Sequence, residues 1–378
     1  MAEHSTIEWT DATWNPVTGC TIVSPGCTNC YAMRLAGTRL KNHPSRIGLT
    51  KPSKAGPVWT GEVRFNEKAL LEPLKWKRPR MIFVCAHGDL FHESVPDEWI
   101  DRVFAVMALC PQHTFQVLTK RSARMLAYMT DPTTRDRLTD AVRAIGRAYD
   151  SKPHSAKRRI MTADDIVGWN AWATAGNLES GTHAWPLPNV WLGVSAERQQ
   201  EADARIPDLL ATPAAVRFVS AEPLLGPIDL QTDLRRYLDH GLSCRPGAID
   251  WIITGGESGR GARPMHPDWA RSIRDQCAAA GVAFLFKQWG AWGDFSDGFA
   301  GNAANIVLAP DGSKLGASTN NIDDMPDIDW RKHGGAWMVR VGKKRAGRLL
   351  DGVEHNGMPD ASVRPIAATQ RSREAVEA

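Results

Sequence analysis

The sequence predicts an α/β protein built as a partial or complete (β/α) barrel of parallel strands. Short apolar runs rich in β-branched residues alternate with amphipathic stretches, which is the pattern of repeated βα units. At least five such units follow one another, and a cysteine-rich loop comes after the first expected strand. Right-handed crossovers place every strand-to-helix loop on one face of such a sheet, so we expect the functional groups on that face.

Each expected strand is a short apolar run, and each expected helix is an amphipathic stretch that follows one. We expect strands near residues 9–16 and at 81–85, 115–119, 190–194, 216–220, 249–254 and 283–286. We expect helices near residues 99–110, 123–129, 199–210 and 268–280.

Two segments interrupt this alternation and define the domain organisation. Residues 151–188 mix basic residues with tryptophans between two βα units, and they indicate an insertion on the barrel. After Trp292 the strand and helix pattern fades into Gly, Asn and Asp. We therefore expect a barrel core at residues 1–295, followed at 296–378 by a C-terminal extension with a basic stretch and a flexible tail.

The composition is that of a globular protein and excludes several classes. The chain has 378 residues, of which 43% are hydrophobic and 23% charged. It contains no apolar run of about 18 residues, so we expect no membrane span. The first residues lack the basic-then-apolar pattern of a signal peptide, so we expect a cytoplasmic protein whose cysteines are thiols or ligands rather than disulfides.

The net charge is only +4, but the positive charge is concentrated in residues 34–80. This basic segment holds twelve Lys and Arg against three Glu, a local charge of +9. Trp59, Phe65 and Trp76 are interleaved with the cations. The segment suits a surface that follows phosphates, with bases stacked on its aromatic rings, although a solvated face is the plain alternative.

Three of the seven cysteines lie together in the loop GCTIVSPGCTNCY at residues 19–31. Cys20, Cys27 and Cys30 form a C-x6-C-x2-C pattern, and the Ser-Pro-Gly sequence between them can fold the chain back. Structural zinc is usually held by four closed ligands, whereas a [4Fe–4S] cluster on three cysteines keeps one iron open. The alternatives are three ordinary loop cysteines, or zinc with one distant His or Cys.

The other four cysteines are scattered singly along the chain, and we interpret them as core or surface thiols. They are Cys85, Cys110, Cys244 and Cys277.

Polar or charged groups follow six of the expected strands, and their positions predict a shared cavity. Any one of these groups could instead cap the following helix. The groups are His87, Gly88 and Asp89; Thr119, Lys120 and Arg121; Ser195 and Glu197; Glu222; Gly255, Gly256, Glu257 and Ser258; and Lys287, Gln288, Trp289 and Gly290.

The cysteine loop resembles the cluster loop of the radical S-adenosylmethionine (radical SAM) superfamily. The usual motif is C-x3-C-x2-C, so the first gap here is longer, and Asn29 stands where an aromatic residue often precedes the last cysteine. Over residues 6–295 the chain is similar to a phage-encoded branch associated with thymine hypermodification in phage DNA. The strings that carry this likeness are TWNPVTGC, SPGC, CYA, GVSAE, SAEPLLGPI, TGGESG and KQWG.

The resemblance implies positions that contact S-adenosylmethionine. Asp89 matches the acid that often receives its amino group, and Lys120 or Arg121 matches the basic residue that meets its carboxylate. Ser195 and Glu197 stand where relatives contact the ribose.

The resemblance also implies positions closer to the substrate. The backbone at Gly255 and Gly256 would approach adenine or substrate closely. The groups expected at the catalytic centre are Glu222, Glu257, Lys287 and Gln288.

The activity implied by the resemblance is a radical reaction in the host cytoplasm. A [4Fe–4S] cluster, reduced by a donor such as a flavodoxin or ferredoxin, cleaves S-adenosylmethionine, and the 5′-deoxyadenosyl radical takes hydrogen from a modified thymine in DNA. One such reaction is an isomerisation that moves a glycyl group from nitrogen to carbon linkage. Radical repair or cleavage of a thymine lesion and a non-enzymatic, zinc-stabilised nucleic-acid-binding module remain alternatives.

Overall fold

The computed structural model describes residues 5–150, 185–230, 248–296, 303–315 and 329–359. Most of the expected insertion, the end of the chain from residue 360 and Cys244 lie outside the described residues. No helix in the described part of the chain combines the length and apolar character needed to cross a membrane.

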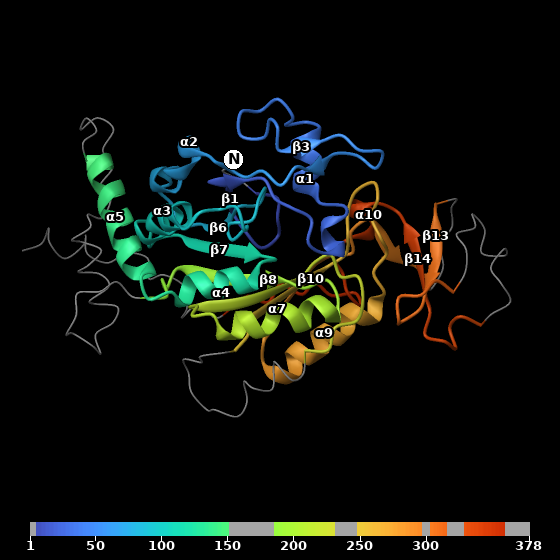
Figure 1. Ribbon diagram of the computed structural model, residues 1–378. Coiled ribbons are helices and arrows are strands. Elements are labelled where there is room, and N and C mark those ends of the chain that lie inside the picture. Colours follow the sequence, from blue (N-terminus) through green and yellow to red (C-terminus); the bar gives the residue numbers. More distant parts are fainter. Residues whose placement is uncertain (1–4, 151–184, 231–247, 297–302, 316–328, 360–378) are drawn as a thin grey trace, which may run out of the picture.

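The core of the molecule is a curled half-barrel sheet of seven parallel strands, which confirms the expected α/β partial barrel (Figure 1). All seven expected strands form, although β1 is short and β10 starts two residues later than expected. In sheet order they are β1 (Ala12–Trp14), β6 (Met81–Val84), β7 (Thr114–Thr119), β8 (Val190–Ser195), β9 (Val216–Ala221), β10 (Trp251–Gly255) and β11 (Ala283–Gln288).

The four expected helices also form and pack on the outer face of the sheet (Figure 1). Helix α9 starts with Pro267, whose missing N–H is not needed in a first turn, and the His266 ring accepts a bond from the amide of Asp268. The four are α3 (Asp97–Ala108), α4 (Ser122–Thr130), α7 (Gln199–Ala211) and α9 (Pro267–Ala280). A further helix, α5 (Thr134–Asp150), packs against α3 and was not expected.

The inner face of the half barrel is aromatic near its base and polar near the ends of its strands. Trp191, Phe218 and Trp251 are fully buried there in one cluster with Trp9. Side chains two residues apart on a strand share a face, so the residues further along the same strands turn toward the same interior. This alternation places Ser195, Ser220 and Lys287 on the inner face.

Short elements close the end of the half barrel that carries the cysteines. They are β2 (Val17–Thr18), η1 (Pro25–Cys27), α1 (Tyr31–Gly37), β3 (Thr50–Lys51), β4 (Val58–Trp59), β5 (Arg64–Phe65), α2 (Glu67–Leu70) and η2 (Pro73–Lys75). Strand β2 pairs with β5, and β3 pairs with β4, so the basic segment folds beside the cysteine loop.

The chain after β11 forms a small antiparallel sheet and then returns to the half barrel. The sheet contains β12 (Trp292–Asp294), β14 (Ala336–Arg340) and β13 (Asn305–Leu308), and α10 (Lys343–Ala346) follows it. Residues 355–357 then bond to β11, through the amides of Phe286 and Gly357.

Candidate functional site

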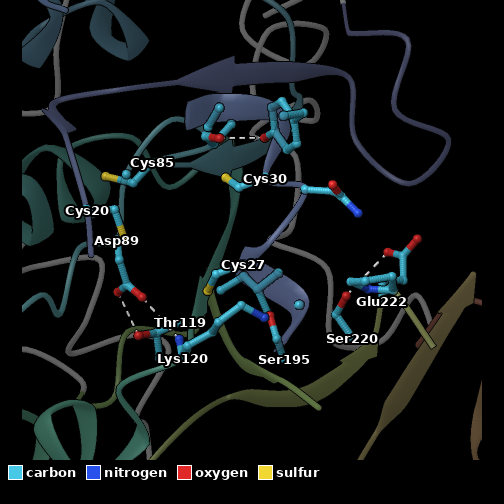
Figure 2. A pocket seen from close by; sticks show the side chains of 18 of the residues that line it. Cys20, Cys27, Cys30, Cys85, Asp89, Thr119, Lys120, Ser195, Ser220 and Glu222 are labelled. Carbon is cyan, nitrogen blue, oxygen red and sulfur yellow. Dashed lines mark hydrogen bonds between the residues drawn. The ribbon is translucent and has the colours of Figure 1, made fainter. Parts of the chain in front are cut away.

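A cavity of about 270 Å³ opens at the carboxyl ends of the parallel strands. The side chains of Cys20, Cys27 and Cys30 border it together (Figure 2). Residues from β6, β7, β8, β9 and β11 form other parts of its wall. Loops at this edge of a parallel α/β sheet commonly carry binding and catalytic groups, so the expected shared cavity is formed.

The local sequence explains how the loop brings the three sulfur atoms to one cavity. Pro25 starts the single turn η1, which ends at Cys27, and the amide of Cys27 bonds to the carbonyl of Ser24 at 2.9 Å. Cys30 is the N-cap residue of α1. Two short turns therefore point Cys27 and Cys30 inward, while Cys20 approaches from the end of the preceding extended segment.

The surroundings of Cys20 and Cys30 favour their protonated forms. Burial raises the pKa of Cys20 to about 12, and the negative charge of Asp89 adds to this effect while Arg121 opposes it. Burial also raises the pKa of Cys30. A metal that binds sulfur as thiolate must therefore displace protons here. Across the described ranges, no group of three or more His, Cys, Asp or Glu side chains is already arranged around a metal position.

Three convergent thiols next to cationic groups nevertheless fit an iron–sulfur cluster as a donor set, because thiolates are its usual ligands and nearby positive charge stabilises them. Cys20, Cys27 and Cys30 are the residues that would hold it.

Arg121 and Asp89 form a buried charged pair beside Cys20. The Arg121 guanidinium lies 3.1 Å from the Asp89 carboxylate and donates to the Cys20 Sγ at 3.4 Å. Asp89 also accepts bonds from the Thr119 hydroxyl at 2.6 Å and from the amide of Lys120 at 3.1 Å (Figure 2). Both side chains line the cavity, but their polar atoms already hold the cysteine loop and β7 in place.

Glu197 lies beneath the cysteine loop and is completely buried. Its carboxylate accepts bonds from the Ser24 hydroxyl at 2.8 Å, from Arg205 at 3.0 Å and from Lys120. Burial opposes ionisation, but Lys120 and Arg205 outweigh it and hold the pKa of Glu197 below its usual value. A Cβ at Gly26 would stand 2.1 Å from this carboxylate, so only glycine lets the loop come this close.

Two other carboxylates reach the cavity from β9 and from the loop after β10. Glu222 pairs with Lys287 at 3.2 Å and accepts a bond from Ser220 at 3.3 Å. Glu257 is occupied by Arg263 at 2.6 Å and by the Asn29 amide at 2.9 Å. Glu257 therefore fastens its own loop to the cysteine loop, whereas Glu222 and Lys287 form a charged pair on the cavity wall.

The cavity also contains polar atoms that have no partner within the described chain. The indole Nε1 of Trp9 is a buried donor, and the amide Oε1 of Gln288 is a buried acceptor. The two side chains are only 4% and 5% exposed. An unpaired buried polar atom costs free energy, so these two side chains are unsatisfied groups in the wall of the cavity.

Almost all of the site residues expected from the sequence line this cavity. Glu197 and Gly255 do not: Glu197 lies behind the loop, and the Gly255 carbonyl accepts the amide of Leu224. Of the other groups expected at the shared cavity, His87, Trp289 and Gly290 are not among its lining residues. Of the scattered cysteines, Cys85, Cys110 and Cys277 are buried as expected, but Cys85 also borders the cavity.

Several further lining residues were missed by the sequence analysis, and some of them are aromatic or polar. Trp9, Tyr31 and Ser220 all border the cavity. The two-residue alternation along β9 identifies Ser220 as inward-facing, so the signal for it was present. Trp9 precedes β1 and Tyr31 follows the last cysteine, so the pattern of residues at strand ends marks neither of them.

The basic segment is more internal than the sequence suggested. Trp76 is 8% exposed and packs under Arg80, and Trp59 is equally buried but lines the cavity. Arg46 is also buried and bonds to His87 at 2.9 Å. These three side chains are not available to a surface ligand.

Comparison with known families places almost the whole described chain in one of them. Residues 4–359 match the model of a family described as "Protein of unknown function (DUF5131)". The chain belongs to this family. No curated protein and no solved structure matches it. The matched residues include the cysteine loop, the seven strands of the half barrel and residues 355–357. The family match therefore covers the whole candidate site.

Proposed function

We propose that the protein is a radical SAM enzyme that holds a [4Fe–4S] cluster on Cys20, Cys27 and Cys30. The observation that carries the proposal is the convergence of three thiols on one cavity, at the carboxyl edge of a parallel half barrel. A reduced cluster supplies the electron that cleaves S-adenosylmethionine to methionine and a 5′-deoxyadenosyl radical.

The protein's own residues position and shield this chemistry. Arg121 and Asp89 fix Cys20, and Glu197 fixes the Ser24–Cys27 turn through the serine hydroxyl. Lys120 lines the cavity while paired to Glu197, so it offers a cation to the carboxylate of S-adenosylmethionine. The aromatic base of the half barrel excludes water from the reactive centre.

The polar groups on the far wall support a modified thymine as the substrate. Gln288 presents a primary amide, which has a donor and an acceptor side by side and matches the N3–H and O4 edge of thymine. Lys287 and Glu222 can bind the carboxylate and the amine of an amino-acid group carried on the base. We propose hydrogen abstraction from such an adduct, followed by an isomerisation from nitrogen to carbon linkage in phage DNA.

Replacing the cysteines one at a time tests the cluster. Each of Cys20→Ala, Cys27→Ala and Cys30→Ala should lose iron, sulfide and S-adenosylmethionine cleavage, because three protein ligands are the minimum for this cluster type. The matched control is Cys110→Ala, which removes a fully buried thiol far from the cavity lining. Iron and sulfide are assayed after anaerobic purification. A colourless protein with stoichiometric zinc, or full iron loading in Cys27→Ala, overturns the assignment.

The reaction is tested with DNA that carries glycyl-thymine deuterated at the glycyl α-carbon. With unlabelled substrate, reduced enzyme should give a product of unchanged mass but altered fragmentation. With the deuterated substrate, one deuterium should appear in 5′-deoxyadenosine, and the product should be lighter than the substrate by that deuterium. If 5′-deoxyadenosine forms only at the rate seen without DNA and contains no deuterium, this substrate class is wrong while the cluster assignment stands.

A further inference from the structure

Arginines from three distant parts of the chain meet at the mouth of the cavity. The loop after β10 contributes Ser258 to the cavity lining, and Arg260 next to it is exposed. Arg340 at the end of β14 donates to the carbonyl of Gly259 at 3.1 Å. From α1, the Nη1 atom of Arg34 lies 3.1 Å from the place that a Cβ would take on Gly259.

Arg263 completes this group, which we call the arginine rim: Arg34, Arg260, Arg263 and Arg340. Arg263 bonds to Glu257 and also to the carbonyl of Pro25 at 3.0 Å, so the rim is attached to the cysteine loop. The rim therefore brings together residues of α1, the loop after β10 and β14, and Arg263 connects it to the cysteine loop.

The positive charge of the rim is only partly balanced by the protein. The carboxylate within the group is Glu257, which Arg263 and Asn29 occupy. Over the described ranges of the chain, neither Arg34 nor Arg260 forms an ion pair with a carboxylate, and Arg340 bonds to backbone carbonyls. Cations held together in this way favour an anionic ligand.

A polynucleotide backbone fits the rim better than a single phosphate does. Guanidinium groups bind phosphate oxygens in a fork-like geometry, and Arg34 and Arg260, which lie on separate elements, can each engage a different phosphate. The rim also borders a cavity whose wall includes Trp9 and Phe83, which suits an unstacked base. A base extruded from a strand keeps its flanking phosphates at the mouth of the pocket that it enters.

We infer that the arginine rim binds the phosphodiester backbone of a DNA strand on either side of the nucleotide whose base occupies the cavity. The inference rests on the proposed function for the identity of the base. It assigns the phosphate contacts to Arg34 and Arg260 of the rim, rather than to the basic segment as a whole.

Binding of a fluorescent single-stranded DNA 12-mer, measured by anisotropy at two salt concentrations, tests the rim. The variants are Arg34→Gln, Arg260→Gln and the double variant, since neither side chain holds backbone in place. The matched control is Arg143→Gln, whose side chain on α5 is 59% exposed. At low salt each rim variant should bind about 3- to 10-fold more weakly, and its slope of log affinity against log salt should fall by about one.

Steady-state kinetics give the second measurement. The double variant should raise KM for an oligonucleotide substrate much more than KM for the corresponding free nucleoside. The inference is overturned if the double variant binds the 12-mer as the unaltered protein does, if Arg143→Gln weakens binding equally, or if both KM values rise together.

The binding measurement does not require the cluster or turnover, so the two proposals fail separately. A protein that binds DNA through the rim but never loads iron contradicts the proposed function alone. An iron-loaded protein that cleaves S-adenosylmethionine and binds DNA equally well without the charges of Arg34 and Arg260 contradicts the rim alone.

Discussion

Lys287 and Glu222 form an ion pair on the cavity wall. In the described chain, neither side chain pairs with any other charged group. Their side chains are 20% and 12% exposed, so each faces a largely dry environment. A substrate carboxylate competes with Glu222 for the Lys287 ammonium. The strength of that contact is that of a charge-assisted hydrogen bond, which typically contributes about 1.5–3 kcal/mol.

We expect Lys287→Met to raise KM about 10- to 100-fold for thymine that carries a glycyl carboxylate. The reason is that the substrate loses its cationic partner while Glu222 stays and repels it. The measurement is KM for this substrate against KM for an analogue in which the carboxylate is replaced by a methyl amide. Glu222→Gln is the matched variant; it removes the anionic partner of the amine, which both substrates carry, and should raise KM for both alike. Equal changes in KM for both substrates in Lys287→Met would show that Lys287 does not meet the carboxylate.

At the scale of elements, Glu197 connects the cysteine loop to β8 and α7. Its carboxylate accepts hydrogen bonds from Ser24 in the loop, from Lys120 at the end of β7 and from Arg205 on α7. Arg205 is only 9% exposed, so it would be left as a buried, unpaired charge without Glu197.

We expect Glu197→Gln to lower the free energy of unfolding by on the order of 3 kcal/mol, because it breaks a buried ion pair on one side. Iron occupancy after reconstitution should fall as well, since the Ser24 turn loses its anchor. Asp203→Asn on the exposed side of the same helix is the control for a general effect on α7. Urea unfolding and iron analysis check both expectations. A variant with unchanged stability but reduced iron would assign Glu197 to the cluster loop alone.

The elements that the sequence revealed are those with strong local patterns. The seven strands are continuous apolar runs because they are covered on both faces, and such runs are visible without any tertiary information. Helix α5 was missed although Leu138, Val142 and Ile145 have helical spacing and are buried. Its polar residues outnumber them, and the adjoining insertion obscured the pattern.

The antiparallel sheet of the extension was missed for a different reason. Strands β12, β13 and β14 are only three to five residues long, and Gly-rich segments separate them. Their register is set by pairing over long sequence distances, for example Trp292 with Arg340, which local pattern does not record. The same limit hid the arginine rim, because Arg34, Arg260 and Arg340 become neighbours only in the folded chain.

For the whole molecule, the open edge of the half barrel must be covered, because an exposed strand edge can pair with another chain. Residues 355–357 cover the edge strand β11. The Phe286 amide donates to the His355 carbonyl at 2.9 Å, and the Gly357 amide donates to the Phe284 carbonyl at 2.8 Å. The Trp251 indole also donates to the Gly357 carbonyl at 2.8 Å. The far end of the chain therefore completes the barrel wall.

We expect a chain that ends at Asp351 to melt roughly 4–6 °C lower than the full chain. Three lost hydrogen bonds of about 1 kcal/mol each account for this shift in a domain of this size. The shortened chain should also aggregate, since β11 becomes a free edge. A chain that ends at residue 359 keeps every one of these bonds and is the control.

Gly357→Ala is a sharper variant, because a Cβ there would stand 2.6 Å from the Phe284 carbonyl oxygen. It should reproduce most of the destabilisation without shortening the chain. Thermal scans and light scattering on the three proteins decide the matter: if the chain ending at Asp351 melts within 2 °C of the control and stays monodisperse, the return of the chain does not protect the edge.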